Sequence, residues 1–281
     1  AGHDAADRLV DWDRTNGENQ LWNLTLVGDW DTFSGDELDG GGVLTPFTEN
    51  RDHNPVHEIE SINATALQHD PKGNLTQDAT PGGGKTYAYD FDNQLKSATV
   101  LAGASGIEGT HSYTYDALGR RVSKTVNPAS GGSTTIIFVC HTQQAPAGTG
   151  SVPAGQVLAE YTPGSAVTAP AQTYMWGSYI DEALYVETPT ASHFLHSNRQ
   201  YSIAAATNAT TGAVEERYTY TPYGQQTLLD AAGAPRTATV VYNTFQTLGH
   251  QGLMHDDETA LIYNRARMRS VGLGRFLQRD P

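Results

Sequence analysis

Short stretches of alternating hydrophobic and polar residues recur along the first half of the chain, and each is interrupted by a turn. The clearest of these stretches has the sequence Tyr113-Thr-Tyr-Asp-Ala-Leu-Gly-Arg-Arg-Val-Ser-Lys-Thr-Val126. An aromatic residue precedes Asp116, a short turn follows, and Val122 restarts the alternation. A two-residue period is typical of strands with one covered face. The pattern therefore predicts a β-hairpin.

Copies of this unit precede it in the chain. The good copies are Tyr87-Ala-Tyr-Asp-Phe-Asp-Asn-Gln-Leu95, Gln68-His-Asp-Pro-Lys-Gly-Asn-Leu75 and His3-Asp-Ala-Ala-Asp-Arg-Leu9, and weaker ones span residues 22–30 and 52–59. The Asp can accept hydrogen bonds from backbone N–H groups two residues on, and Gly119, Gly73 or Asn93 can supply the positive φ that the turn requires. A single hairpin is marginally stable in water, so the units must stack on one another. We expect an all-β fold, a stacked β-hairpin sheet or solenoid.

The amino-acid composition agrees with this expectation, and the net charge disfavours some classes of binding partner. The chain of 281 residues has 29 Gly, 13 Pro and 14 Tyr with 17% charged residues, as expected for many turns joining short strands. A formal net charge of −14 disfavours nucleic acid and anionic membrane surfaces as partners. The single cysteine, Cys140, is expected to be a small buried hydrophobe. The chain does not begin with a signal-peptide pattern, so an export signal is expected outside it.

These repeats resemble the YD repeats of the Rhs family, which also occur in the C components of insecticidal Tc toxin complexes and in teneurins. Downstream of turn-rich stretches at 145–155 and 162–170, three ordered blocks at 174–187, 202–224 and 248–281 resemble the Rhs repeat-associated core domain. The predicted organisation is therefore degenerate YD repeats over residues 1–145, followed by a core domain over 146–281 that is continuous with the repeats.

The resemblance implies a function. Such chains form part of a hollow shell that encloses a C-terminal toxin or effector, and the core cuts the chain just beyond residue 281. The implied partners are the chain's own C-terminal cargo and the upstream repeats, with a cell-surface protein or glycan as a further partner that the resemblance allows. No cofactor is implied, and the expected location is secreted or at the cell surface. The alternative is a teneurin-like scaffold for adhesion or carbohydrate binding that does not cleave.

The resemblance also places the cleavage chemistry, at most a single-turnover aspartyl-type autoproteolysis without activity on other substrates. Asp280 is expected to activate the attacking water, and Arg267 to keep that carboxylate ionised and stabilise the oxyanion. Arg265 and Arg269 compete with Arg267 for this role. If residues 263–268 form a strand, Arg265 and Arg267 share one face. The first Asp-Pro pair of the family pattern falls here on Ser270-Val271, so a mechanism with two aspartates lacks one partner.

Other clusters favour no metal or sugar site. His250 with the segment His255–Glu258, and the pair His53 and His57, lack a complete local ligand set. The acidic segment 29–42 does not fit an EF-hand loop and is expected to be solvated. The aromatic side chains at two-residue spacing are expected to fill a β core. The sequons at Asn23, Asn63, Asn74 and Asn208 matter only in a suitable secretory host.

Overall fold

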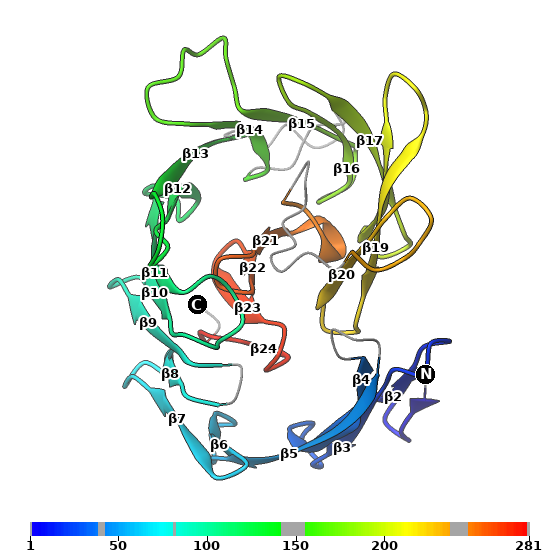
Figure 1. The fold of residues 1–281 in the computed structure, drawn as a ribbon. Helices are drawn as coiled ribbons and strands as arrows, with labels where there is room; N and C mark the ends of the chain where they lie inside the picture. Colours follow the sequence, from blue (N-terminus) through cyan, green and yellow to red (C-terminus); the bar gives the residue numbers. More distant parts are fainter. Residues whose placement is uncertain (1, 39–42, 81–82, 142–154, 237–246, 280–281) are drawn as a thin grey trace. The chain divides into compact units, whose positions relative to one another are not determined.

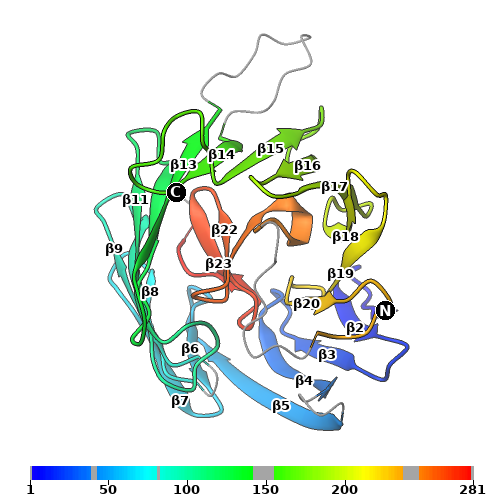
Figure 2. The same ribbon diagram turned by 45° about the horizontal axis from the view of Figure 1, so that its top comes forward.

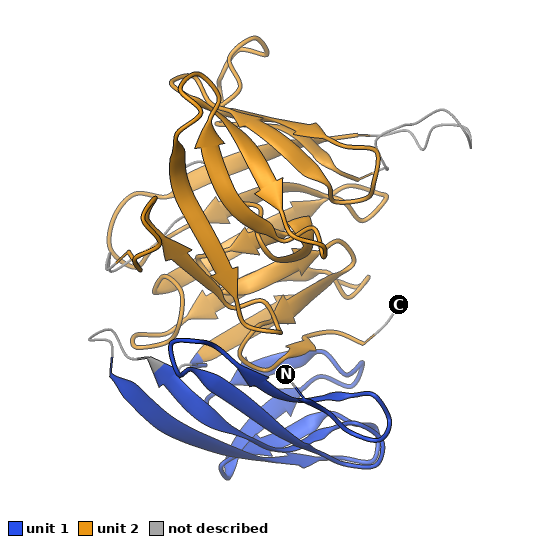
Figure 3. Ribbon diagram, turned by 90° about the vertical axis from the view of Figure 1, so that its right-hand side faces the viewer, with its two compact units in different colours: residues 1–84 blue, residues 85–281 orange. Residues whose placement is uncertain are grey.

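The structure is a computed structural model that describes residues 2–38, 43–80, 83–141, 155–236 and 247–279, and these divide into two compact units. Unit 1 comprises residues 1–84 and unit 2 residues 85–281 (Figure 3). The strands of unit 1 are β1 (Gly2–His3), β2 (Leu9–Asp13), β3 (Asn19–Leu24), β4 (Trp30–Leu38), β5 (Leu44–His53), β6 (Ile59–Ile62), β7 (Thr65–His69) and β8 (Leu75–Asp78).

Unit 2 contains a long series of strands and a short C-terminal group. The series is β9 (Lys85–Tyr89), β10 (Leu95–Val100), β11 (Gly109–Tyr115), β12 (Arg121–Val126), β13 (Thr134–Cys140), β14 (Val157–Tyr161), β15 (Gln172–Trp176), β16 (Ala183–Glu187), β17 (Ser192–Ser197), β18 (Ile203–Asn208), β19 (Val214–Tyr220) and β20 (Gln226–Leu229). The C-terminal group is a 3-10 turn η1 (His250–Gly252), β21 (Met254–Asp256), β22 (Leu261–Asn264), β23 (Arg267–Ser270) and β24 (Arg275–Phe276).

Each strand pairs antiparallel with its neighbour in sequence. This holds from β1 to β8 in unit 1 and from β9 to β20 in unit 2. The prediction of an all-β fold built from successive hairpins is confirmed. No helix among the described residues is long and apolar enough to cross a membrane. The predicted boundary at residue 145 falls outside the described residues and stays a prediction.

One turn recurs through the described residues. Its first N–H donates to the carbonyl of the fifth residue, its fourth N–H donates to the carbonyl of the first, and the fourth residue has positive φ. This is the geometry of a short hairpin loop that ends in a left-handed residue. The ten copies begin at Asp4, Arg14, Thr25, Asn54, Asp70, Asp90, Asp116, Asn198, Thr221 and Asp230.

The predicted role of the aspartate is confirmed. Oδ1 of Asp116 accepts hydrogen bonds from the backbone N–H groups of Leu118 and Arg120 at 2.9 and 3.0 Å. Gly119 follows with φ 77°, a conformation that costs a glycine little. Asn198 and Asp230 make the same paired bonds to the residues two and four positions on. This turn therefore continues well into residues 146–281, the region in which a core domain is predicted.

In six of the ten copies the fifth and eighth residues after the first residue of the turn are both buried, although a regular strand would point them to opposite faces. An irregularity in the pairing next to the turn brings both side chains to the covered face. In four of these copies the two buried positions hold hydrophobic residues: Trp30 and Phe33, Ile59 and Ile62, Leu95 and Ala98, Ile203 and Ala206. In the repeat that begins at Asp116 they hold Arg121 and Lys124.

The strands β9–β20 of unit 2 curve around the C-terminal sheet β21–β24, which lies inside the curve in both views (Figures 1 and 2). The sheet β21–β24 is separate from the long series and has its own antiparallel pairing. Its side chains Met254, Leu261, Ile262, Met268 and Leu277 are buried. The covered face of the long sheet is therefore the surface that holds the C-terminal sheet in place.

Candidate functional site

A buried cluster of charges joins strand β12 to the C-terminal sheet. Arg121 Nη1 lies 2.5 Å from Oδ2 of Asp256, and Lys124 Nζ lies 3.1 Å from both Asp256 Oδ1 and Glu258 Oε2. The hydroxyl of Tyr113 donates to Glu258 Oε1 at 3.1 Å. The side chains of Arg121 and Asp256 are 1% and 0% exposed. These ion pairs are therefore shielded from solvent and from salt.

The protonation of the cluster follows from its geometry. Burial alone would raise the pKa of Asp256, but the nearby Arg121 and Lys124 outweigh it and hold this pKa below its usual value. Burial would likewise lower the pKa of Lys124, and the carboxylates of Glu258 and Asp256 outweigh it and raise this pKa. Asp256 and Lys124 are thus both charged at neutral pH.

Aromatic rings complete the surroundings of Arg121. Its guanidinium carbon lies 4.2 Å from the ring centroid of Tyr263 and 5.1 Å from that of Phe138. The Tyr263 hydroxyl also accepts a hydrogen bond from the Arg121 backbone N–H at 3.0 Å. Tyr263 belongs to β22, so the C-terminal sheet contacts both the side chain and the backbone of one residue in the long sheet.

Residues 263–268 do not form one strand, so that expectation is wrong. Asn264 pairs with Arg267 across a two-residue turn, and Arg265 has φ 53° within it. A tight hairpin turn of this kind requires positive φ and reverses the chain. Arg265 therefore shares no strand face with Arg267, whereas Arg267 and Arg269 lie on one face of β23.

The three candidate arginines have different neighbours. Arg265 Nη2 lies 2.5 Å from Oδ1 of Asp181, so this guanidinium forms a structural ion pair. The guanidinium carbon of Arg267 lies 3.8 Å from the ring centroid of Phe276 in the next strand. Arg269 Nη2 donates to Nδ1 of His250 at 2.8 Å. Asp280 lies outside the described residues, so its pairing with Arg267 stays a prediction.

The last described residues are held firmly along β23. The Leu277 N–H donates to the Met268 carbonyl at 2.8 Å, and Oε1 of Gln278 accepts from the Met268 N–H at 2.8 Å. Nε2 of Gln278 reaches the Asn93 carbonyl of the long sheet at 3.3 Å. Ser270, at the position of the missing family aspartate, is buried, and its hydroxyl accepts from the Leu273 N–H. The path of the chain up to Gln278 is thus fixed by backbone and side-chain bonds.

The histidines near this sheet are neutral. His255 Nε2 accepts a hydrogen bond from the His250 N–H at 2.9 Å. Burial lowers the pKa of His255 to about 3, and burial with the nearby Arg269 lowers that of His250 to about 4. A turn joins β21 to β22 over this segment, and two of its three carboxylates, Asp256 and Glu258, are engaged by Arg121 and Lys124.

The remaining predicted candidates are placed as follows. His57 Nδ1 lies 2.7 Å from Oδ2 of Asp29, and His53 ends strand β5. Cys140 is half-buried at the end of β13, and burial raises the pKa of its thiol, which disfavours the reactive thiolate. Part of the acidic segment, residues 39–42, lies outside the described residues. Asn74 of one sequon is buried, and its amide donates to Asp70.

Stacked hairpins that share one turn, with a C-terminal sheet ion-paired to one of them, define an all-β repeat protein. The chain is 27% identical over 234 residues to the tRNA nuclease WapA of Bacillus subtilis strain 168. It is 26% identical over 234 residues to the tRNA3(Ser)-specific nuclease WapA of Bacillus spizizenii. Each match covers 83% of this chain and 8% of the curated relative. The resemblance to the Rhs/YD-repeat family is confirmed by these matches.

Among solved structures, the crystal structure of TcdB2-TccC3-TEV matches 100% of this chain and 18% of that chain, with 12% identity and a TM-score of 0.48. The crystal structure of TcdB2-TccC3 matches the same shares with 14% identity and a TM-score of 0.34. No protein-family model matches the chain.

Proposed function

We propose that the chain belongs to the C-terminal part of a secreted or surface-located Rhs/YD-repeat shell that encloses a toxic polypeptide and releases it by cutting itself just beyond residue 281. The observation that carries this proposal is the anchoring of the C-terminal sheet. The ion pairs of Arg121 and Lys124 and the bonds of Gln278 hold the chain end rigidly inside the curve of unit 2. Rigid placement of one peptide bond is what a single self-cleavage requires.

In this proposal Asp280 takes a proton from the water that attacks the carbonyl carbon of the scissile bond. Arg267 keeps the carboxylate ionised and stabilises the negative charge that develops on the carbonyl oxygen. The leaving amine then takes a proton, and the cargo is freed from the shell. The names of the curated relatives support an enzyme as cargo, because a nuclease is a polypeptide that its own cell must keep enclosed.

The test uses the chain extended through its native continuation. The extended chain should cut itself within about a dozen residues after Asp280 in the presence of EDTA and without added protease, which mass spectrometry of the fragments would locate. Asp280→Asn and Arg267→Ala should remain whole while circular dichroism shows the same fold. Arg265→Ala is the matched control: its guanidinium pairs with Asp181, so cleavage should persist.

An extended wild-type chain that stays whole after prolonged incubation contradicts the proposal and favours a non-cleaving scaffold. Cleavage that EDTA stops would instead assign the chemistry to a metal at His255–Glu258. Cleavage that persists in both Asp280→Asn and Arg267→Ala would remove these two residues from the mechanism.

A further inference from the structure

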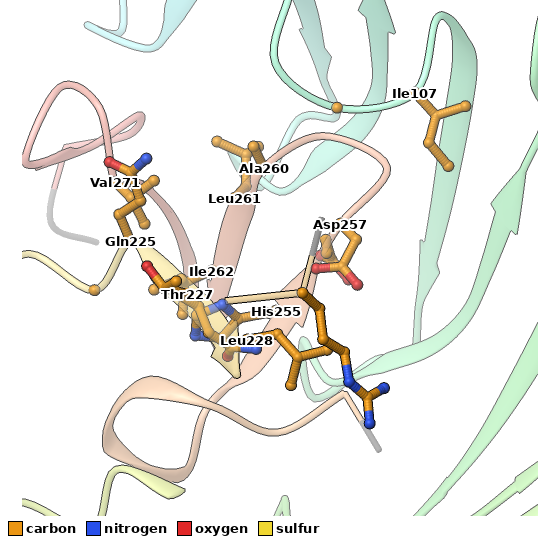
Figure 4. Close-up of a pocket in the computed structure, with 15 residues that line it drawn as sticks. Ile107, Gln225, Thr227, Leu228, His255, Asp257, Ala260, Leu261, Ile262 and Val271 are labelled. Carbon is orange, nitrogen blue, oxygen red and sulfur yellow. The ribbon is translucent and has the colours of Figure 1, made fainter. Parts of the chain in front are cut away.

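Unit 2 contains a cavity of about 390 Å³ beside the buried charge cluster (Figure 4). Its walls come from the loop at Ile107, from Leu228 of β20 and from the C-terminal sheet, and they mix aliphatic side chains with polar and charged ones. Asp257 presents a carboxylate to this cavity, and Leu261 of β22 and Val271, just after β23, line it from the C-terminal sheet (Figure 4). The cavity thus offers aliphatic side chains beside polar groups, and two carboxylates, Asp256 and Asp257, are part of its lining.

The carboxylate of Asp257 has no hydrogen bond or ion pair with the described residues, in contrast to its two neighbours in sequence. Asp256 and Glu258 take both Arg121 and Lys124, so three consecutive acids share two cations. The other charged or titratable side chains of the lining do not supply a cation to Asp257. Arg236 donates to Glu216 at 2.8 Å, and His255 is neutral.

The pKa of Asp257 agrees with the lack of a nearby positive charge paired with its carboxylate. Burial raises its pKa to about 7, Lys124 opposes this shift, and the like charges of Glu258 and Asp256 add to it. An ionised carboxylate there is poorly solvated and lies next to an empty volume. A cation that enters the cavity would relieve this repulsion, whereas an anion would increase it.

We propose that this cavity binds an alkylammonium group, namely a lysine side chain of the enclosed cargo polypeptide. The ammonium would pair with Asp257, and its four-carbon stem would lie along Ile107, Leu228 and Leu261. The identity of the occupant rests on the proposed enclosing function, but the chemistry of the cavity does not. A lysine suits this cavity because its ammonium is a compact charge on a flexible apolar stem, so the charge can reach Asp257 while the stem contacts the aliphatic side chains.

The test uses the 281-residue chain with n-butylammonium as the probe and NMR or calorimetric titration as the readout. Saturable binding at about millimolar probe is expected, because so small a ligand has few atoms to contribute. Binding should be lost in Asp257→Asn and kept in the control Asp92→Asn, whose exposed carboxyl lies away from the cavity. Affinity should fall about tenfold from pH 8 to pH 6, because the carboxyl must be ionised.

Three outcomes overturn the cavity as an ammonium site: no binding by the wild-type chain, undiminished binding by Asp257→Asn, or equal binding of the uncharged probe 1-butanol. The occupant is tested separately in the extended chain, where carbodiimide should join Asp257 to a cargo lysine. Absence of this cross-link, with probe binding intact, overturns the cargo lysine as the occupant. Loss of self-cleavage alone changes neither measurement, so the two proposals fail independently.

Discussion

Arg121 and Asp256 are 135 residues apart in the sequence and form an ion pair of 2.5 Å that is almost completely buried. Arg121 occupies a position that other repeats fill with Leu95 or Ile203. A pair of charges in a hydrophobic position is costly unless each is compensated. This relationship therefore ties the C-terminal sheet to one particular hairpin of the long sheet.

The first prediction concerns the loss of this compensation. Asp256→Ala should lower the free energy of unfolding by about 3–5 kcal/mol, because it leaves Arg121 and Lys124 buried with only Glu258 between them. Urea denaturation followed by tryptophan fluorescence would measure the change. The exposed carboxyl of Asp92 serves as the control, and Asp92→Ala should change stability by less than about 0.5 kcal/mol. Equal effects of the two substitutions would contradict the buried pair.

Stability should depend on pH through Asp257. Its folded pKa of about 7 lies above the usual value of 3.8, so its contribution is most favourable below pH 4 and is lost as pH rises through 7. Asp257→Asn should therefore stabilise the chain more at pH 8 than at pH 5, by at most about 3 kcal/mol, because the unfolded carboxyl is already ionised at pH 5. Paired denaturation curves at the two pH values would test the sign. A variant whose benefit is the same at both would show that Asp257 titrates normally.

The shared turn predicts a local cost for side chains at its fourth residue. A Cβ at Gly119 would combine φ 77° with an approach of 2.7 Å to Nε2 of Gln94. Gly119→Ala should therefore lower the melting temperature, at a cost of about 1–2 kcal/mol. Gly132→Ala is a close control, since a Cβ there meets nothing within 4 Å and φ is not positive. A Gly119→Ala variant as stable as Gly132→Ala would argue against this turn geometry.

Restoring the family residue at the C-terminal sheet should affect cleavage. Ser270→Asp supplies the second carboxyl that the two-aspartate pattern requires, so the extended chain should cut itself faster than the wild type. Ser270→Asn is the control: the asparagine side chain has nearly the size of aspartate but no ionisable group, so this variant should not cut itself faster than the wild type. Time courses on denaturing gels would compare the three. If Ser270→Asp leaves the cleavage rate unchanged, a second carboxyl at position 270 does not contribute to the reaction.

Hydrogen exchange should distinguish the weakest and strongest strands. No residue of β2 is fully buried, whereas Leu261 and Ile262 of β22 are 1% and 0% exposed. Amides of β22 should therefore exchange much more slowly than those of β2, since local opening of β2 exposes little apolar surface. Comparable exchange rates in the two strands would contradict the burial that the structure shows.

The sequence predicted the hairpins well because their turns use local chemistry. Asp116 and Gly119 are recognisable three residues apart, and their turn is formed as expected. The copy at Asn198 was missed because its left-handed residue is Tyr201, a residue type that rarely adopts positive φ. In that copy the surrounding hydrogen bonds hold a conformation that the side chain alone does not favour.

The candidate site was less predictable, because its residues meet only through tertiary structure. Arg121 and Lys124 look like residues of opposite strand faces, and the irregular pairing beside the turn brings both inward. One signal was available: these charges stand where Leu95 and Ala98 stand in the preceding copy. The turn at Arg265 was missed for a different reason: hairpin turns of two residues usually contain a glycine, and neither residue of this turn is one.

The placement of Arg121 and Lys124 marks one hairpin of the long sheet as the one that the C-terminal sheet contacts. If every repeat had the same hydrophobic residues at its two buried positions, the sheet β21–β24 could pack equally well against a neighbouring hairpin. Asp256 and Glu258 are compensated only where a repeat carries matching cations, so a slipped arrangement would bury uncompensated charge on both sides. The position of the C-terminal sheet along the long sheet is therefore set by the single repeat that carries Arg121 and Lys124.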